Sequence, residues 1–157
     1  ASLLGLASQT AQPRVYVIGR KLGEDVLRPL SERHPDDETF TGLLILRPEG
    51  RLFFFFLQHV AARIRQLIAQ YQPRVVVLDM SRVTDVEYSA LMMLVEGDLH
   101  ARLKGGELWL AGLNPEVLEN VRRCGLARQL GETRLLFNAR AAIRQYQQQW
   151  SGEQGER

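Results

Sequence analysis

The feature that most constrains the fold is residues 74–113, where a short apolar run, a helical pattern and a second apolar run follow one another. Residues 75–78 read Val-Val-Val-Leu and stop at Asp79, which is typical of a strand covered on both faces of a parallel sheet. The spacing of the next apolar residues predicts a helix with one buried stripe: Leu91, Leu94, Val95, Leu99 and Leu103. Residues 107–110 form another strand, so the unit is strand, helix, strand, a right-handed crossover.

The rest of the chain continues this alternation. Strands are expected at residues 14–20, 43–47, 52–55 and 135–137, and Pro48, Glu49 and Gly50 predict a hairpin turn between the second and third of these. Further helices are expected near residues 60–71, after the cap Asn114, and after the cap Asn138. We therefore predict an α/β fold, a mixed and mostly parallel sheet of about five strands with about four α-helices.

Length and composition set the domain organisation. A chain of 157 residues, 45% of them hydrophobic, can fill one core. We assign residues 14–150 to a single domain, residues 1–13 to a linker or disordered N-terminus, and residues 151–157 to a disordered tail. No apolar run approaches the roughly 20 residues that a bilayer span needs, so we expect the chain itself to be soluble.

Two segments do not fit a simple pattern. Residues 21–42 show no period and are interpreted as a long loop, which in a compact domain is often functional. Residues 53–57 read Phe-Phe-Phe-Phe-Leu and are interpreted first as a strand buried on both faces. The alternative is a contact surface for a partner or a membrane, carried by Phe55 and Phe56.

The residue types that carry common chemistries are not arranged for them. His34, His59 and His100 are far apart in sequence and have no metal-ligand neighbour at a useful spacing, so no metal site is predicted. The two glycine-rich patterns that bind phosphate groups, the Walker motif and Gly-x-Gly-x-x-Gly, do not occur in the sequence. The net charge of +2 comes from scattered arginines, which argues against nucleic acid as a partner, and the single Cys124 is expected to be a buried thiol. The residues themselves predict no cofactor and no enzyme.

The loop between Asp79 and the following helix is the best candidate site. Ser89 is placed where the helix begins, with its hydroxyl available to cap the first backbone N–H groups. Phosphorylation of Ser89 would add close to two negative charges beside Asp85 and Glu87, so this serine is a candidate switch. Asp79 also resembles the phospho-accepting aspartate of receiver domains, but Gly19 and its basic neighbours stand where those domains carry an acidic pair.

Several motifs taken together resemble the STAS domain. They are the Val-Leu-Asp-Met-Ser strand end at residues 77–81, the Asp-Val-Glu-Tyr-Ser-Ala-Leu helix start at residues 85–91, and Gly-Glu-Leu-Trp-Leu-Ala-Gly-Leu at residues 106–113. The first strand, Val-Tyr-Val-Ile-Gly-Arg, and Gly-Leu-Leu-Ile-Leu-Arg at residues 42–47 are similar to the branch found as cytoplasmic tails of SulP-type sulfate and anion permeases. The other branch is that of anti-sigma factor antagonists. The resemblance covers residues 14–150.

This resemblance implies a non-enzymatic regulatory module on the cytoplasmic face of a membrane, as part of a permease. Its expected partner is the transmembrane domain of that permease or a cytosolic protein, with a second copy of the chain as a further candidate. Ser89 matches the hydroxyl that is phosphorylated in the antagonist branch, whereas Glu87 and Tyr88 replace the residues usual before it. The implied ligand or partner loop contains Asp79, Ser81, Asp85, Glu87 and Tyr88. Nucleotide binding is implied by the resemblance alone.

Overall fold

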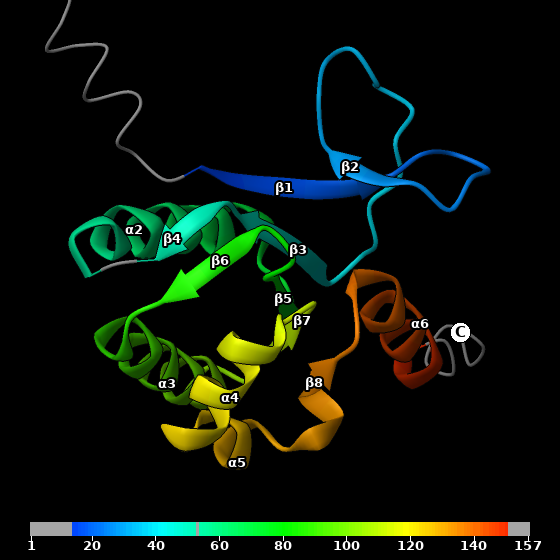
Figure 1. The fold of residues 1–157 in the computed structure, drawn as a ribbon. Coiled ribbons are helices and arrows are strands. Elements are labelled where there is room, and N and C mark those ends of the chain that lie inside the picture. The colour runs from blue at the N-terminus through cyan, green and yellow to red at the C-terminus, as the bar shows by residue number, and fades with distance from the viewer. Residues whose placement is uncertain (1–13, 53, 151–157) are drawn as a thin grey trace, which may run out of the picture.

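A mixed sheet forms the centre of the molecule. The computed structural model describes residues 14–52 and 54–150, so the predicted linker 1–13 and tail 151–157 lie outside the described residues. The sheet has six strands in the order β2-β1-β3-β5-β7-β8 (Figure 1). Strands β3, β5, β7 and β8 are parallel, and β1 is antiparallel to both of its neighbours. The strand bounds are β1 Val15–Arg20, β2 Leu27–Pro29, β3 Leu43–Pro48, β5 Val75–Asp79, β7 Glu107–Ala111 and β8 Leu135–Leu136. The predicted fold class is confirmed.

Helices cover the two faces of the sheet unequally. Alternate strand residues such as Leu44, Val76 and Leu110 pack in one core with the helices α2 Phe54–Tyr71, α3 Tyr88–Leu103, α4 Pro115–Arg123 and α5 Leu126–Leu130. The residues between them, such as Val75 and Trp109, form a second core with α6, Ala139–Trp150. Figure 1 shows α6 by itself on one side of the sheet. A 3-10 turn, Glu132–Arg134, leads into β8.

A separate two-stranded ribbon replaces the predicted hairpin. Gly50 has a φ of +95°, but β4, Gly50–Leu52, pairs in parallel with β6, Val83–Val86. The hairpin prediction is wrong because turn residues predict a change of direction and not the partner strand.

The strand interpretation of residues 53–57 is also wrong, since helix α2 begins at Phe54. A run of identical aromatic residues has no period that separates strand from helix. The side chains of Phe55 and Phe56 lie outside the described part.

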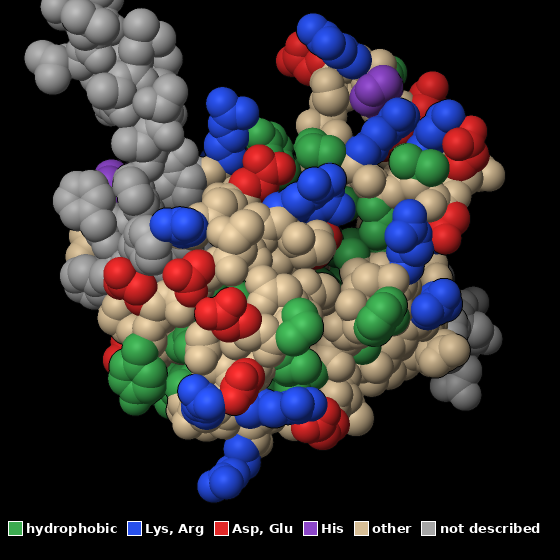
Figure 2. Space-filling view, in the orientation of Figure 1, with side chains coloured by type: hydrophobic (Ala, Val, Ile, Leu, Met, Phe, Trp, Pro, Cys, Tyr) green, Lys and Arg blue, Asp and Glu red, His purple; other side chains and the backbone are tan. Residues whose placement is uncertain are grey.

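The predicted long loop is an ordered arm. Residues 21–40, called the arm here, contain β2 and pair again with β1 through Arg20 and Glu38. Figure 1 shows the arm extending beyond the helical layers, and Figure 2 shows basic and acidic side chains intermingled over it. Arg28 binds Asp37 through two hydrogen bonds of 2.7 Å. These bonds lower the pKa of the Asp37 carboxyl and raise the pKa of Arg28. Strand pairing with β1 and ion pairs hold the arm, and Leu27 and Phe40 pack at the margin of the second core.

One helix leaves apolar residues exposed, and another differs from its predicted stripe. Ile68 and Tyr71 of α2 are exposed, and Val60 and Leu67 supply the buried contacts of that helix. On α3 the predicted core residue Leu99 is 51% exposed, and its neighbour Asp98 is fully buried. The cause is α5, whose Gln129 side-chain amide donates to Asp98 Oδ2 at 2.9 Å and to the Val95 carbonyl at 3.0 Å. Packing against the short helix α5 therefore decides which residues of α3 are buried, and the spacing of the apolar residues of α3 does not.

Candidate functional site

Asp79 is held inside the protein at the carboxyl end of β5. It is 2% exposed; Arg47 Nε donates to its Oδ2 at 3.0 Å, and the Ser81 backbone N–H donates to its Oδ1 at 3.1 Å. Arg47 comes from the neighbouring strand β3 and is itself largely buried. Both carboxylate oxygens are therefore engaged by the protein, which suits a structural anchor for the loop better than a phospho-accepting aspartate.

Gly112 allows the loop after Asp79 to lie against the end of β7. Its φ is +67°, a backbone region that side chains disfavour. A Cβ at this position would lie 3.2 Å from both Asp79 Oδ1 and Ser81 Cβ. The sequence motif at residues 106–113 included this glycine, but only the structure shows that its role is close approach to the candidate loop.

The loop that precedes Ser89 contains a strand. The sequence predicted an irregular segment from Asp79 to Ser89, whereas β6 occupies residues 83–86 and pairs with β4. Asp85, the partner of Arg51 in this ribbon, is half-buried. Ser81 and Glu87 are exposed, and Tyr88 is 68% exposed. The predicted loop residues thus differ in solvent exposure. Asp79 is buried, whereas Ser81, Glu87 and Tyr88 are accessible.

Ser89 is not the N-cap of α3. The helix begins at Tyr88, so Ser89 is its second residue and Glu87 precedes the helix. The Ser89 hydroxyl donates to Glu87 Oε2 over 3.4 Å, a long and weak bond. The capping prediction is therefore wrong by two positions, as often happens when a helix start is inferred from one polar residue. The hydroxyl remains partly accessible beside a carboxylate.

Asn114 connects the candidate loop to helix α4. The sequence did not predict this connection. Its Oδ1 accepts from the Val117 backbone N–H at 2.8 Å, the cap that was predicted and is confirmed. Its Nδ2 donates to the backbone carbonyls of Val83 at 3.3 Å and Thr84 at 3.4 Å, both in β6. The Asn-Pro pair signals the cap, and no local signal reveals the contact with a strand some thirty residues earlier in the chain.

Glu87 and the Ser89 hydroxyl determine the charge and hydrogen-bonding chemistry at the start of α3. Within residues 14–52 and 54–150 no group of three or more His, Cys, Asp or Glu side chains is placed to hold a metal ion. A phosphate on Ser89 would lie beside the Glu87 carboxylate, and like charges at that distance repel. The helix N-terminus would favour the same phosphate. Phosphorylation of Ser89 would therefore change the charge at the start of α3, next to the exposed Glu87 and Tyr88.

None of the described helices is long and apolar enough to cross a membrane.

Comparison with known proteins agrees with the motifs and the fold. The family model for the STAS domain matches residues 34–142. Among curated proteins, High affinity sulfate transporter 2 of Stylosanthes hamata is 27% identical over 148 residues, which cover 88% of this chain and 22% of the transporter. Sulfate transporter 4.1, chloroplastic, of Arabidopsis thaliana is 28% identical over 144 residues, which cover 83% of this chain and 21% of that protein. The chain thus spans about a fifth of the length of these relatives.

Two solved structures show how the fold is shared. The structure of SLC26A9 superimposes with a TM-score of 0.73 at 19% identity, covering 99% of this chain and 27% of that one. The anti-sigma factor antagonist SpoIIAA in its unphosphorylated form gives a TM-score of 0.58 at 15% identity, covering 70% of this chain and 92% of its own. At these identities the two similarities establish the fold alone.

Proposed function

The chain belongs to the STAS domain family, and from this premise we propose that it is the cytoplasmic regulatory domain of a SulP-type sulfate or anion transporter. It acts without catalysis, through contacts with the transmembrane domain of its own transporter or with a cytosolic partner. The observation that carries this proposal is the match to sulfate transporters over 88% of this chain and only 22% of theirs. A segment of that proportion fits one domain of a transporter, whose transport pathway would lie in the remainder.

The accessible start of α3 supports the contact part of the proposal. Glu87 and Tyr88 are exposed beside Ser89, and tyrosine is enriched among residues that anchor protein interfaces. The loop is held from behind by buried Asp79 and by Asn114, so its exposed side chains are presented on a fixed support. A preorganised surface loses less conformational entropy when a partner binds.

The test of the transporter proposal is anion uptake by the complete gene product that contains this chain. Expressed in cells that lack sulfate uptake, the wild-type protein should restore uptake of labelled sulfate or of a competing anion. Tyr88→Ala, which removes only an exposed side chain, should lower uptake several-fold at unchanged membrane abundance, with exposed Leu22→Ala in the arm as the matched control. A gene product that moves no anion, or equal effects of the two variants, would contradict the proposal.

Ser89 supports a second candidate function, that of a phosphorylation-switched antagonist. The similarity to SpoIIAA covers 92% of that protein, and Ser89 lies at the start of a helix beside Glu87. Under this alternative, Ser89→Asp should weaken binding to the partner at least tenfold, because a second carboxylate would lie next to Glu87. Ser89→Ala should bind as the wild type does. Ser31→Asp, an exposed serine in the arm, controls for added charge, and equal affinities of Ser89→Asp and Ser89→Ala would exclude the switch.

A further inference from the structure

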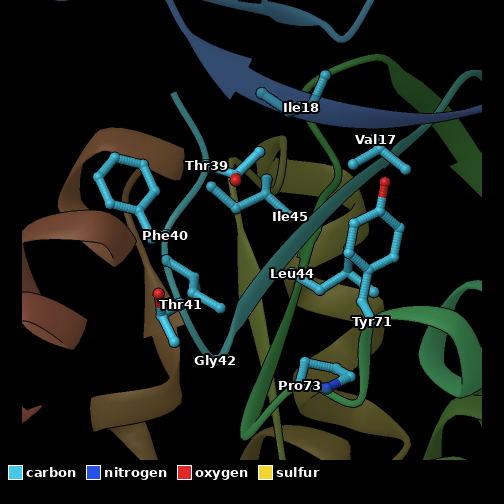
Figure 3. A pocket seen from close by; sticks show the side chains of 11 residues that line it. Val17, Ile18, Thr39, Phe40, Thr41, Gly42, Leu44, Ile45, Tyr71 and Pro73 are labelled. Atoms are coloured by element: carbon cyan, nitrogen blue, oxygen red, sulfur yellow. The ribbon is translucent and has the colours of Figure 1, made fainter. Parts of the chain in front are cut away.

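The sheet opens between β1 and β3. Hydrogen-bonded pairing between these strands ends at Val17 and Leu46, although the same register would next bring Ile18 opposite Ile45. Beyond this point Arg20 pairs with Glu38 instead. The returning end of the arm is thus inserted where β1 and β3 would otherwise continue to pair. A cavity of about 220 Å³ lies at this opening (Figure 3).

Apolar and hydroxyl-bearing residues both line this cavity, and polar atoms make up the larger share of its accessible surface. Ile18 and Ile45, both 3% exposed, are buried residues of the lining. Thr39, Thr41 and Tyr71 are exposed residues of the lining. Figure 3 shows the Tyr71 ring along one side, its hydroxyl directed toward Val17. The described lining residues are Val17, Ile18, Thr39, Phe40, Thr41, Gly42, Leu43, Leu44, Ile45, Tyr71 and Pro73.

Volume and charge define the ligand that fits. A protein cavity of about 150 Å³ with apolar walls holds one benzene molecule, so a cavity of this size accommodates one ring with a small substituent. None of the described lining residues carries a charge at neutral pH, and burying an unpaired charge costs far more than burying a hydroxyl that finds a hydrogen-bond partner. The nearby Arg20 is paired with Glu38 at 3.1 Å and lies over the Phe40 ring. Its charge is therefore balanced by Glu38, and Arg20 is not itself part of the described lining.

We propose that the opening between β1 and β3 is a binding site for a small uncharged molecule, a single ring that bears a hydroxyl. The ring of the ligand would lie on the side of Ile18 and Ile45, and its hydroxyl would exchange hydrogen bonds with the polar atoms of the lining. The site is separate from the Ser89 loop, because it lies at the amino end of β3 whereas Ser89 follows the carboxyl end of β5. None of the described lining residues would supply a positive charge to sulfate, phosphate or a nucleotide.

Occupation of this site has a structural consequence. The ligand would contact β1, the turn at residues 39–42, β3 and the end of α2 at once. The arm begins and ends at this opening, so the ligand would hold the arm against the parallel part of the sheet. Binding to the folded state alone also raises thermal stability with ligand concentration.

Phenol is the probe, with benzene and benzoate as matched comparisons that remove the hydroxyl or replace it with a charge. Amide chemical shifts of the isotope-labelled chain are recorded during each titration. Phenol should produce saturable amide shifts confined to residues 17–18, 39–45 and 71–72. Benzoate should bind at least tenfold more weakly. Absence of localised, saturable shifts with phenol, or equal binding of benzoate, would overturn the proposal.

Substitutions inside and outside the lining test whether the chemical-shift changes arise from binding in the cavity. Val17→Phe should fill the opening and abolish phenol binding, whereas Val15→Phe, on the same face of β1 but outside the lining, should leave it intact. Thr39→Val keeps the shape of an exposed side chain and removes its hydroxyl. It should weaken phenol binding several-fold and leave benzene binding unchanged, a readout that remains if Val17→Phe fails to fold. Equal phenol affinity in Thr39→Val and wild type, or loss of binding in Val15→Phe alone, would contradict the assignment.

Discussion

At the scale of single residues, the ion pair between Asp79 and Arg47 fixes the edge of the sheet from which the candidate loop emerges. The two side chains are 3% and 14% exposed, and their Nε–Oδ2 distance is 3.0 Å. Surface pairs with this geometry contribute little, because water and salt screen them. A buried pair behaves differently, since loss of one partner leaves the other charge without compensation in a medium of low polarity.

We therefore expect Asp79→Ala to lower the free energy of unfolding by about 3–5 kcal/mol, as is typical when one member of a buried ion pair is removed. Replacement of both residues, Arg47→Met with Asp79→Leu, should recover a large part of that loss, because no uncompensated charge remains. Urea unfolding followed by circular dichroism measures both. Glu119→Ala, which removes the exposed partner of Arg123, is the control and should change stability by less than about 1 kcal/mol. A loss this small for Asp79→Ala would show that the pair is dispensable.

The sequence located Asp79 and not its partner. A hydrophobic strand that stops at an aspartate indicates the end of β5, and this prediction is confirmed. Arg47 lies 32 residues earlier, and its contact with Asp79 depends on the parallel register of β3 against β5. A single sequence contains no local signal for such a pairing. Ser89 illustrates the same limit, since the residue was identified but its position in the helix was not.

At the scale of elements, local patterns predicted what each segment is better than what it packs against. The central strand β5 and the caps Asn114 and Asn138 are all confirmed. The arm strand β2 and the β4–β6 ribbon were missed, because both are three or four residues long and depend on pairing with distant segments. Asp98 was missed for a related reason, since a buried carboxylate is stable there only because α5 supplies Gln129.

A substitution at Asn114 can remove its hydrogen bonds to β6 and keep its cap of helix α4. Asn114→Asp keeps an oxygen for the Val117 N–H and loses the donor to the β6 carbonyls. We expect α4 to retain its protection while the amides of β6 exchange faster with solvent, with a stability loss of about 0.5–1.5 kcal/mol. Native-state hydrogen exchange measures the two elements in one experiment.

The matched control for this variant is Asn138→Asp, because Asn138 caps α6 through its side-chain oxygen at 2.8 Å in the same way. It should leave exchange in β6 and the overall stability close to those of the wild type. Unchanged exchange in β6 of Asn114→Asp would mean that the two bonds of 3.3 and 3.4 Å contribute nothing to holding the strand.

At the scale of the whole molecule, the two faces of the sheet depend on very different amounts of helix. Four helices share one core, whereas α6 is the described helix that covers the other. Beneath α6 lie Val75, Val77 and Trp109, each with no exposed surface. Tyr146 also donates a hydrogen bond of 2.5 Å to the Thr41 carbonyl, which connects α6 to the turn beside the cavity. One helix thus closes the second core and supports the base of the arm.

Removal of residues 139–157 should therefore abolish cooperative unfolding. Each large apolar side chain that loses its cover costs roughly 1.5–3 kcal/mol, and three such residues together approach the typical stability of a whole domain, about 5–15 kcal/mol. The truncated chain keeps Trp109 and loses Trp150, so its tryptophan fluorescence reports on the uncovered core alone. Its emission should be shifted to the wavelength of exposed indole before any denaturant is added. The chain that lacks only residues 151–157 should unfold as the full chain does, and a sharp transition with a buried Trp109 in the shorter one would show that the sheet is stable without α6.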